Sequence, residues 1–188
     1  MKRTLIALSL SAAALTSAMA APETYTIDPN HTFPTFEVNH LGYSIQRGRF
    51  DKTSGTITLD LAAKTGSADI TIETGSIDMG FEEWNKHMDE KFLNVAKFPT
   101  MTFKSSKFKF KGDTLAEVAG DLTLLGVSKP VTLKVDVFKC APHPMLKKDA
   151  CGANATTTIK RSDFGMGAYI PMVGDEIKIA FGIEAIKN

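Results

Sequence analysis

Apolar and polar residues alternate along most of this chain, which is the period of a β-strand with one buried face. The most regular stretch covers residues 177–184, where Ile177, Ile179, Phe181 and Ile183 alternate with polar or small residues. Shorter stretches with the same period lie at residues 35–40, 56–60, 68–73, 101–104, 107–111, 121–124 and 133–137. Together they predict an all-β protein of about eight strands.

Short polar segments separate these stretches and supply the residues that turns prefer. They lie at residues 52–55, 63–66, 111–113, 126–130 and 173–175. Short turns and one-sided alternation favour antiparallel pairing, because parallel strands need long crossover connections and are buried on both faces. About eight antiparallel strands form either a sandwich or a closed up-and-down barrel, and the pattern leaves both open.

One segment, residues 79–94, changes to the period of a helix. Phe81, Trp84, Met88 and Phe92 stand three or four positions apart, so a helix would carry them on one face. The acidic and basic residues of the segment fall mostly on the other faces. The spacing therefore predicts one amphipathic helix inserted between strands.

The first twenty residues have the pattern of a cleaved secretory signal peptide. Lys2 and Arg3 precede an apolar run, and Ala18 and Ala20 place small residues at the cleavage site. The run is too short to span the hydrocarbon core of a bilayer, about 30 Å thick. We expect cleavage after Ala20 and a single mature domain, residues 21–188, in the periplasm.

Charge excludes one large class of partner. Without the two basic residues of the signal peptide, the chain carries 20 Lys and Arg against 21 Asp and Glu. No segment is rich in arginine, and no basic face is apparent. A near-neutral domain of this kind is a poor nucleic-acid binder, and we expect no nucleic-acid partner.

The chain has two cysteines, Cys140 and Cys151, in a protein expected to reach an oxidising compartment. The segment between them contains two prolines and is predicted to be a loop. A structural disulfide closing such a loop stabilises by roughly 3 kcal/mol. A redox-active pair is the alternative, but the chain lacks the C-x-x-C spacing typical of one.

Candidate catalytic or metal chemistry is sparse. His40 shares strand parity with the apolar residues before it, so it faces inward either to bind a ligand head group or as a hydrogen-bonded core histidine. A metal site would have to join His31 and His40 with His87 or His143, and no H-x-x-x-H or H-E-x-x-H spacing is present. The G-x-S-x-G motif of hydrolases is also absent. We expect no enzymatic activity, no metal and no cofactor.

An ordered set of short motifs resembles the YceI-like family of periplasmic lipid-binding proteins. The set covers almost all of residues 24–186. Its main members are Tyr25-x-Ile27-Asp28 with His31, Phe36-x-Val38-x-His40-Leu41-Gly42, Gly48-Arg49-Phe50, Ala96-Lys97-Phe98-Pro99-Thr100, Gly126-Val127-Ser128-Lys129-Pro130 and Arg161-Ser162-Asp163-Phe164-Gly165.

The resemblance implies an eight-stranded, lipocalin-like antiparallel barrel with an elongated apolar tunnel for a polyisoprenoid or similar long-chain lipid. Pattern alone does not distinguish such a hollow barrel from one filled by its own side chains. The ligand expected is a polyprenyl chain, a prenyl quinone or a fatty-chain lipid. The residues expected to contact it are Phe36, Val38, His40, Phe50, Ile70, Ile72, Phe81, Trp84, Met88, Phe92, Phe103, Leu122, Leu124, Val135, Phe164 and Phe181.

The chain departs from the family pattern on the predicted helix. Family members commonly have Arg-Asp-x-His where this chain has Trp84-Asn85-Lys86-His87. We therefore expect a periplasmic carrier or sequestering protein with an altered head-group end. A homodimer and transient membrane contact are further expectations from the resemblance and the lipid role. Two alternatives stay open: an isoprenoid-modifying enzyme that uses His40, and a filled-barrel stress or interaction protein without lipid.

Overall fold

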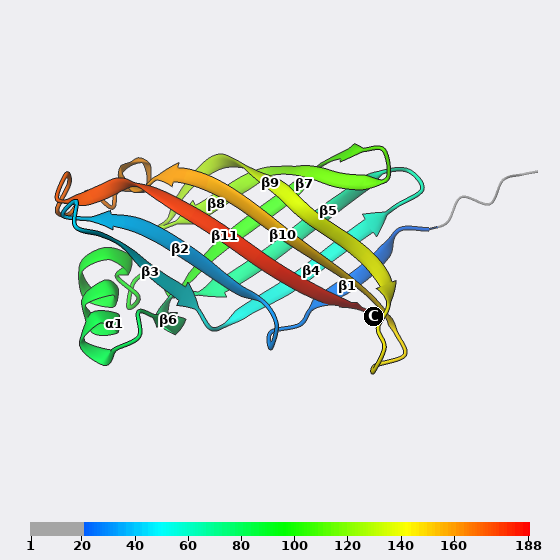
Figure 1. Ribbon diagram of the computed structural model, residues 1–188, viewed down its shortest axis with the longest axis horizontal. Coiled ribbons are helices and arrows are strands. Elements are labelled where there is room, and N and C mark those ends of the chain that lie inside the picture. Colours follow the sequence, from blue (N-terminus) through cyan, green and yellow to red (C-terminus); the bar gives the residue numbers. More distant parts are fainter. Residues whose placement is uncertain (1–20) are drawn as a thin grey trace, which may run out of the picture.

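A computed structural model describes residues 21–188, and the predicted signal peptide lies outside the described residues. A single antiparallel sheet closes on itself to form a barrel (Figure 1). Its strand segments are β1 (Glu23–Ile27), β2 (Phe33–His40), β3 (Ser44–Phe50), β4 (Thr53–Asp60), β5 (Thr65–Glu73), β6 (Ile77–Asp78), β7 (Thr100–Lys111), β8 (Thr114–Leu124), β9 (Val127–Pro142), β10 (Asp149–Lys160) and β11 (Val173–Lys187).

These segments form eight long strands, because three of the strands are bent and each counts as two segments. The halves are β1 with β2, β3 with β4, and β5 with β6: β1 pairs with β4 while β2 pairs with β3. The ring closes where β11 pairs with β1, with Tyr25 opposite Lys187. The predicted eight-stranded antiparallel barrel is confirmed, and the sandwich alternative is wrong.

The predicted helix lies at one end of the barrel, next to β3 and β6 (Figure 1). It consists of α1 (Glu82–Met88) and a continuing helical turn, η2 (Asp89–Leu93). It ends at Asn94, which adopts the left-handed conformation with φ of 47°. Two short 3-10 turns complete the secondary structure, η1 (Thr74–Ser76) and η3 (Arg161–Phe164). Among the described residues, no helix is both long and apolar enough to cross a membrane.

Several strands differ from the predicted ones. The two stretches predicted at 101–104 and 107–111 are one strand, β7, whose pairing with β8 shifts register between Ser105 and Lys107. The turn predicted at 173–175 lies inside β11, at an irregularity in its pairing with β2. β3 and β10 have no clear apolar alternation, because their inward positions hold small residues such as Gly48 and Ala155.

The two cysteines form the predicted disulfide. Cys140 and Cys151 are directly opposite each other on β9 and β10 and are bonded. The loop prediction for the intervening residues is only partly correct, because both strands continue past the cysteines. The connection between β9 and β10 is residues 143–148. The disulfide therefore fastens the end of a long hairpin, at the end of the barrel away from α1 (Figure 1).

Reducing this disulfide is expected to lower the free energy of unfolding by about 3 kcal/mol, the loop-closure entropy of a segment of this length. In a domain of this size that corresponds to a melting temperature lower by roughly 6–12 °C. Thermal unfolding with and without reductant measures the effect, and the Cys140→Ser/Cys151→Ser variant should melt with the reduced protein. An unchanged melting temperature in a sample with two titrated free thiols would contradict the prediction.

Candidate functional site

An apolar cavity of about 120 Å³ lies inside the barrel at the end covered by the helix. Twenty residues line it, and all but Thr35 and Arg161 are apolar. Alternation along the strands explains this composition, since successive side chains point to opposite sides of a sheet. The inward positions of β2 contribute Phe36 and Val38, and those of β8 contribute Leu122 and Leu124.

The helix closes one side of the cavity with its C-terminal half. Met88, Phe92 and Leu93 all line the cavity, and the last two are buried. The segment before the helix is fixed to it by a hydrogen bond of 2.7 Å from the Met79 backbone N–H to Asn85 Oδ1. An aspartate would accept the same bond, so this part of the departure from the family pattern preserves the contact.

A glycine allows the helix segment to approach the barrel. Gly48 on β3 faces the cavity region, and a Cβ atom there would lie 2.4 Å from the Met79 Sδ atom and 2.7 Å from Phe36 Cζ. Both distances are far shorter than ordinary van der Waals contact. Only glycine lets these two cavity-lining side chains pack over β3 without displacement.

Arg161 is the one charged residue in the cavity wall, and it is only 2% exposed. Its Nε donates to the Gly174 carbonyl at 2.8 Å, and its guanidinium NH2 group donates to the Val173 carbonyl at 2.7 Å. The third hydrogen bond, from the NH1 group, goes to the carbonyl of Met166, which lies in the connection just after η3. Arg161 thus fastens the connection between β10 and β11, which forms one edge of the cavity mouth.

The charge of Arg161 is compensated mainly by carbonyl dipoles. Burial lowers the pKa of the guanidinium, although an arginine keeps its proton in any case. Hydrogen bonds from the Ser162 backbone N–H and hydroxyl lower the pKa of the nearby Asp175, so that its carboxylate is charged at neutral pH. The guanidinium also lies over the Phe92 ring, 5.6 Å from its centroid, which links this connection to the helix.

A second, smaller apolar cavity of about 50 Å³ lies toward the disulfide end of the barrel. Tyr25 and Cys151 are among its lining residues. A row of inward side chains separates the two cavities, since Phe103 is paired directly with Ile70 on one side and with Leu122 on the other. Ile70 and Phe103 line the smaller cavity and Leu122 the larger.

The structure distributes the sixteen residues expected to contact lipid over three places. Nine line the larger cavity: Phe36, Val38, Phe50, Ile72, Met88, Phe92, Leu122, Leu124 and Phe181. Three line the smaller one: Ile70, Phe103 and Val135. The remaining four are His40, Phe81, Trp84 and Phe164, and they line neither cavity. Contact of any of these residues with a ligand stays a prediction.

Phe81 differs most from its predicted placement on the inner face of the helix, because it is 56% exposed. It is the residue before the helix and has an extended backbone (φ −162°, ψ 144°), so the helical period does not include it. The Trp84 ring lies near two other rings: its centroid is 6.4 Å from that of Phe81 and 6.5 Å from that of His40. Phe164 is fully packed in η3, in the core beside the larger cavity.

Sequence reasoning missed several lining residues, most of them outside regular alternation. Met79 precedes the helix, and Met166 lies in the connection after η3; Met101, near the start of β7, is an exception that lies within an alternating stretch. Together with Met88 they bring four flexible thioether side chains to one cavity. Arg161 was part of a family motif, but the pattern of the sequence contained no signal for its burial.

A separate cluster of titratable groups lies at the kink between β1 and β2. The Asp28, His31 and Glu184 side chains place their ligand atoms within 4.8 Å of one another, a spacing at which they could hold a cation. His31 Nδ1 and Asp28 Oδ2 are 2.7 Å apart and form an ion pair when the histidine is protonated. His40 and His87, considered above as partners of His31, do not belong to this cluster.

The hydrogen bond and charge of Asp28 raise the pKa of His31 above the ordinary value of 6.5, and His31 in turn lowers the pKa of Asp28. The stability that the ion pair contributes is therefore fully present between about pH 3.8 and 6.5, and it disappears as the pH rises through the raised His31 pKa. On the acid side it disappears as the pH falls through the lowered Asp28 pKa, below 3.8.

An NMR titration of the His31 imidazole should show the raised pKa, and Asp28→Asn should return that pKa to the ordinary range. The same pKa in both proteins would contradict the ion pair.

Comparisons with known proteins agree with this architecture. A family model described as the YceI-like domain matches residues 25–185. A UPF0312 protein of Pseudomonas aeruginosa is 38% identical, and Protein YceI of Salmonella arizonae is 37% identical. Each alignment covers 100% of this chain and 100% of the relative.

Solved structures share the fold. BcnA of Burkholderia cenocepacia has a TM-score of 0.72 and 26% identity, over 85% of this chain and 99% of BcnA. A polyisoprenoid binding domain from Saccharophagus degradans has a TM-score of 0.66 and 17% identity, over 87% of this chain and 98% of that domain. At that identity the second likeness concerns the fold alone.

Proposed function

The chain belongs to the YceI-like domain family, and from that membership and the shape of its barrel we propose that it is a periplasmic carrier for one long-chain isoprenoid or acyl lipid. The observation that carries the proposal is the cavity under the helix, whose lining is apolar apart from Thr35 and Arg161. The three nitrogen atoms of Arg161 are already engaged with backbone carbonyls. The cavity thus offers an environment for a hydrocarbon tail and little chemistry for transforming one.

Burial of the tail supplies the binding free energy. Each methylene removed from water contributes about 0.8 kcal/mol, so about ten buried methylenes supply roughly 8 kcal/mol before the costs of association. The four methionines of the wall suit a ligand of variable shape, because their unbranched side chains adapt at low cost. The Saccharophagus degradans domain of the same fold is described as polyisoprenoid-binding, so a barrel of this fold is compatible with a ligand of this chemical class.

The larger cavity alone accommodates only the first part of such a tail. Its volume of about 120 Å³ is close to that of an engineered cavity of about 150 Å³ that binds benzene. For a longer tail to enter, the Phe103 side chain and its neighbours in the dividing row turn aside. This movement joins the two cavities along the barrel axis. The head group then stays at the mouth, between the helix and the β10–β11 connection.

Native mass spectrometry of the protein exported to a bacterial periplasm tests the proposal. We expect one stoichiometric adduct whose extracted mass identifies a prenyl or long-chain lipid. Incubation of lipid-free protein with a prenyl quinone should restore an adduct of one-to-one stoichiometry. A protein that carries no adduct and binds neither prenyl quinones nor fatty amides would support the filled barrel instead.

A further inference from the structure

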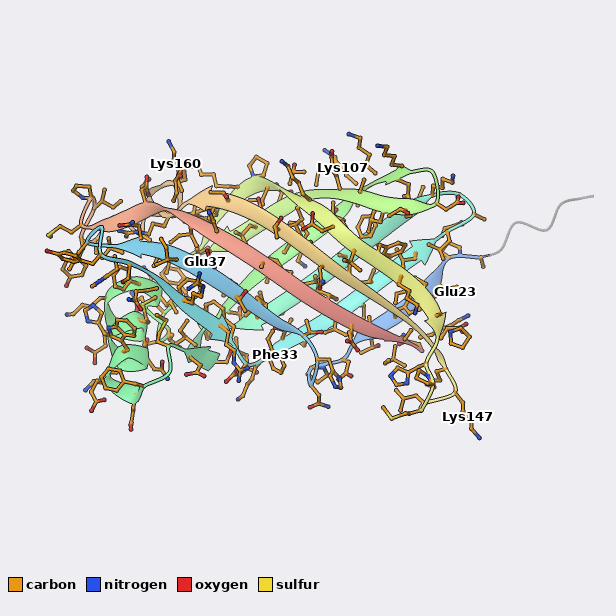
Figure 2. All side chains as sticks on the ribbon, viewed as in Figure 1. Glu23, Phe33, Glu37, Lys107, Lys147 and Lys160 are labelled. Carbon is orange, nitrogen blue, oxygen red and sulfur yellow. A yellow bond between two sulfur atoms is a disulfide. The ribbon has the colours of Figure 1, made fainter. Side chains whose placement is uncertain are left out.

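The two ends of the barrel differ in the charge of their loops. At the helix end, residues 38–45 and 164–174 contain no Asp, Glu, Lys or Arg, in a chain with 23% charged residues. At the opposite end, the β4–β5, β7–β8 and β9–β10 connections all carry charge, including Lys64, Asp113 and Lys147. Figure 2 shows Lys147 projecting from the tip of the β9–β10 loop, far from α1.

The uncharged loops at the helix end expose large apolar side chains. Tyr43 is 89% exposed and Met172 is 56% exposed. We call the exposed apolar residues of the two loops the apolar rim, namely Leu41, Tyr43, Ile45, Tyr169, Ile170 and Met172. The loops are neighbours, because the Leu41 backbone N–H donates to the Met172 carbonyl at 2.7 Å. The rim is therefore one continuous surface.

The same two loops form the cavity mouth on their inner side. Val38 on β2 precedes the first loop, Met166 belongs to the second, and Val173 begins β11 directly after it; all three line the larger cavity. Tyr169 of the rim also lies against the helix, with its ring centroid 5.9 Å from that of Phe92. Apolar surface thus continues from the outside of the rim into the cavity.

We propose that the apolar rim docks on the surface of a phospholipid bilayer, so that a lipid passes between the membrane and the cavity without crossing water. The inference rests on the proposed lipid-carrier function. The bilayer is the occupant because it is where a poorly soluble lipid resides, and because entry of these loops into its interface buries no charged side chain from them. Tyrosines at such a surface place their rings among the acyl chains and their hydroxyl groups in water.

Flotation of the mature protein with vesicles of phosphatidylethanolamine and phosphatidylglycerol tests the docking. We expect the wild-type protein to float with the vesicles and Tyr43→Asp/Met172→Asp to lose at least tenfold in the bound fraction. The matched control is Met145→Asp/Leu146→Asp at the opposite end, where Met145 is 80% exposed; it should stay within twofold of wild type. Since the rim is uncharged, raising the salt concentration should not release the protein from the vesicles.

Three results would overturn the docking surface. The first is wild-type protein that does not float with the vesicles. The second is an equal loss of the bound fraction in the rim variant and in the control variant. The third is a wild-type protein that is a dimer, does not float, and becomes a monomer in the rim variant. The last would assign the rim to a second copy of the chain. Native mass spectrometry separates this inference from the proposed function: wild-type protein that floats yet carries and accepts no lipid would refute the carrier and leave the membrane surface intact.

Discussion

Leu124→Asp is expected to abolish lipid retention while leaving a folded barrel. Leu124 lies near the end of β8, lines the larger cavity and is 6% exposed. The wall around Leu124 is apolar apart from Thr35 and Arg161, and the Arg161 donors already bind backbone carbonyls. A carboxyl group left unpaired in such a wall costs about 2–7 kcal/mol. The lower part of that range already corresponds to roughly a 100-fold loss of affinity. Native mass spectrometry of exported protein should show the variant without the adduct of the wild type.

The neighbouring position provides the control for this variant. Thr123 alternates with Leu124, is on the outer side of β8 and is hydrogen-bonded to Ser128 on the next strand. Thr123→Asp introduces the same charge one residue away without facing the cavity, so we expect it to keep its lipid. Full retention by a folded Leu124→Asp protein would show that the tail does not occupy this cavity. Loss by both variants would point to a general weakening of the barrel instead.

How much of the fold the sequence predicts depends on what faces inward. β5 and β11 alternate large apolar with small or polar residues, so their pattern reports their orientation directly. β10 faces the interior with Cys151, Ala153 and Ala155, which are too small to produce a clear apolar period. The position of β10 in the sheet is determined by its pairing with two long neighbours, β9 and β11. Such pairing between distant segments cannot be recognised from the local sequence of β10.

The candidate site shows the same division. Phe36, Leu122 and Phe181 are on regular strands, where alternation indicates which side chains face inward, and all three line the larger cavity. The flanking positions could not be placed, because Met79 and Met166 belong to irregular segments where neither the strand nor the helix period holds. The apolar rim also escapes a periodic analysis, since its signal is the absence of charge over two distant loops that only the fold brings together.

The β10–β11 connection depends on Arg161, and Arg161→Met is expected to lower the free energy of unfolding by about 3 kcal/mol. Methionine fills much of the buried volume, but it leaves the carbonyls of Met166, Val173 and Gly174 without their donors. A buried acceptor left unpaired costs about 1–3 kcal/mol. The total is smaller here because Met166, Val173 and Gly174 are only half-buried and because a buried charge is removed as well. A loss of this size lowers the melting temperature by roughly 6–12 °C.

The effect of Arg161→Met should be local in amide hydrogen exchange, with protection lost first in residues 165–175, the segment that the guanidinium fastens. Lys160→Met is the matched control, because Lys160 is exposed and Figure 2 shows its side chain pointing away from the barrel. Arg161→Lys keeps the charge but lacks the planar set of donors that reaches three carbonyls, so it should recover only part of the stability. A methionine variant with wild-type stability and exchange would show that the connection holds the cavity mouth without Arg161. In that case the packing of Phe92 against Tyr169, rather than the guanidinium, would close this end of the barrel.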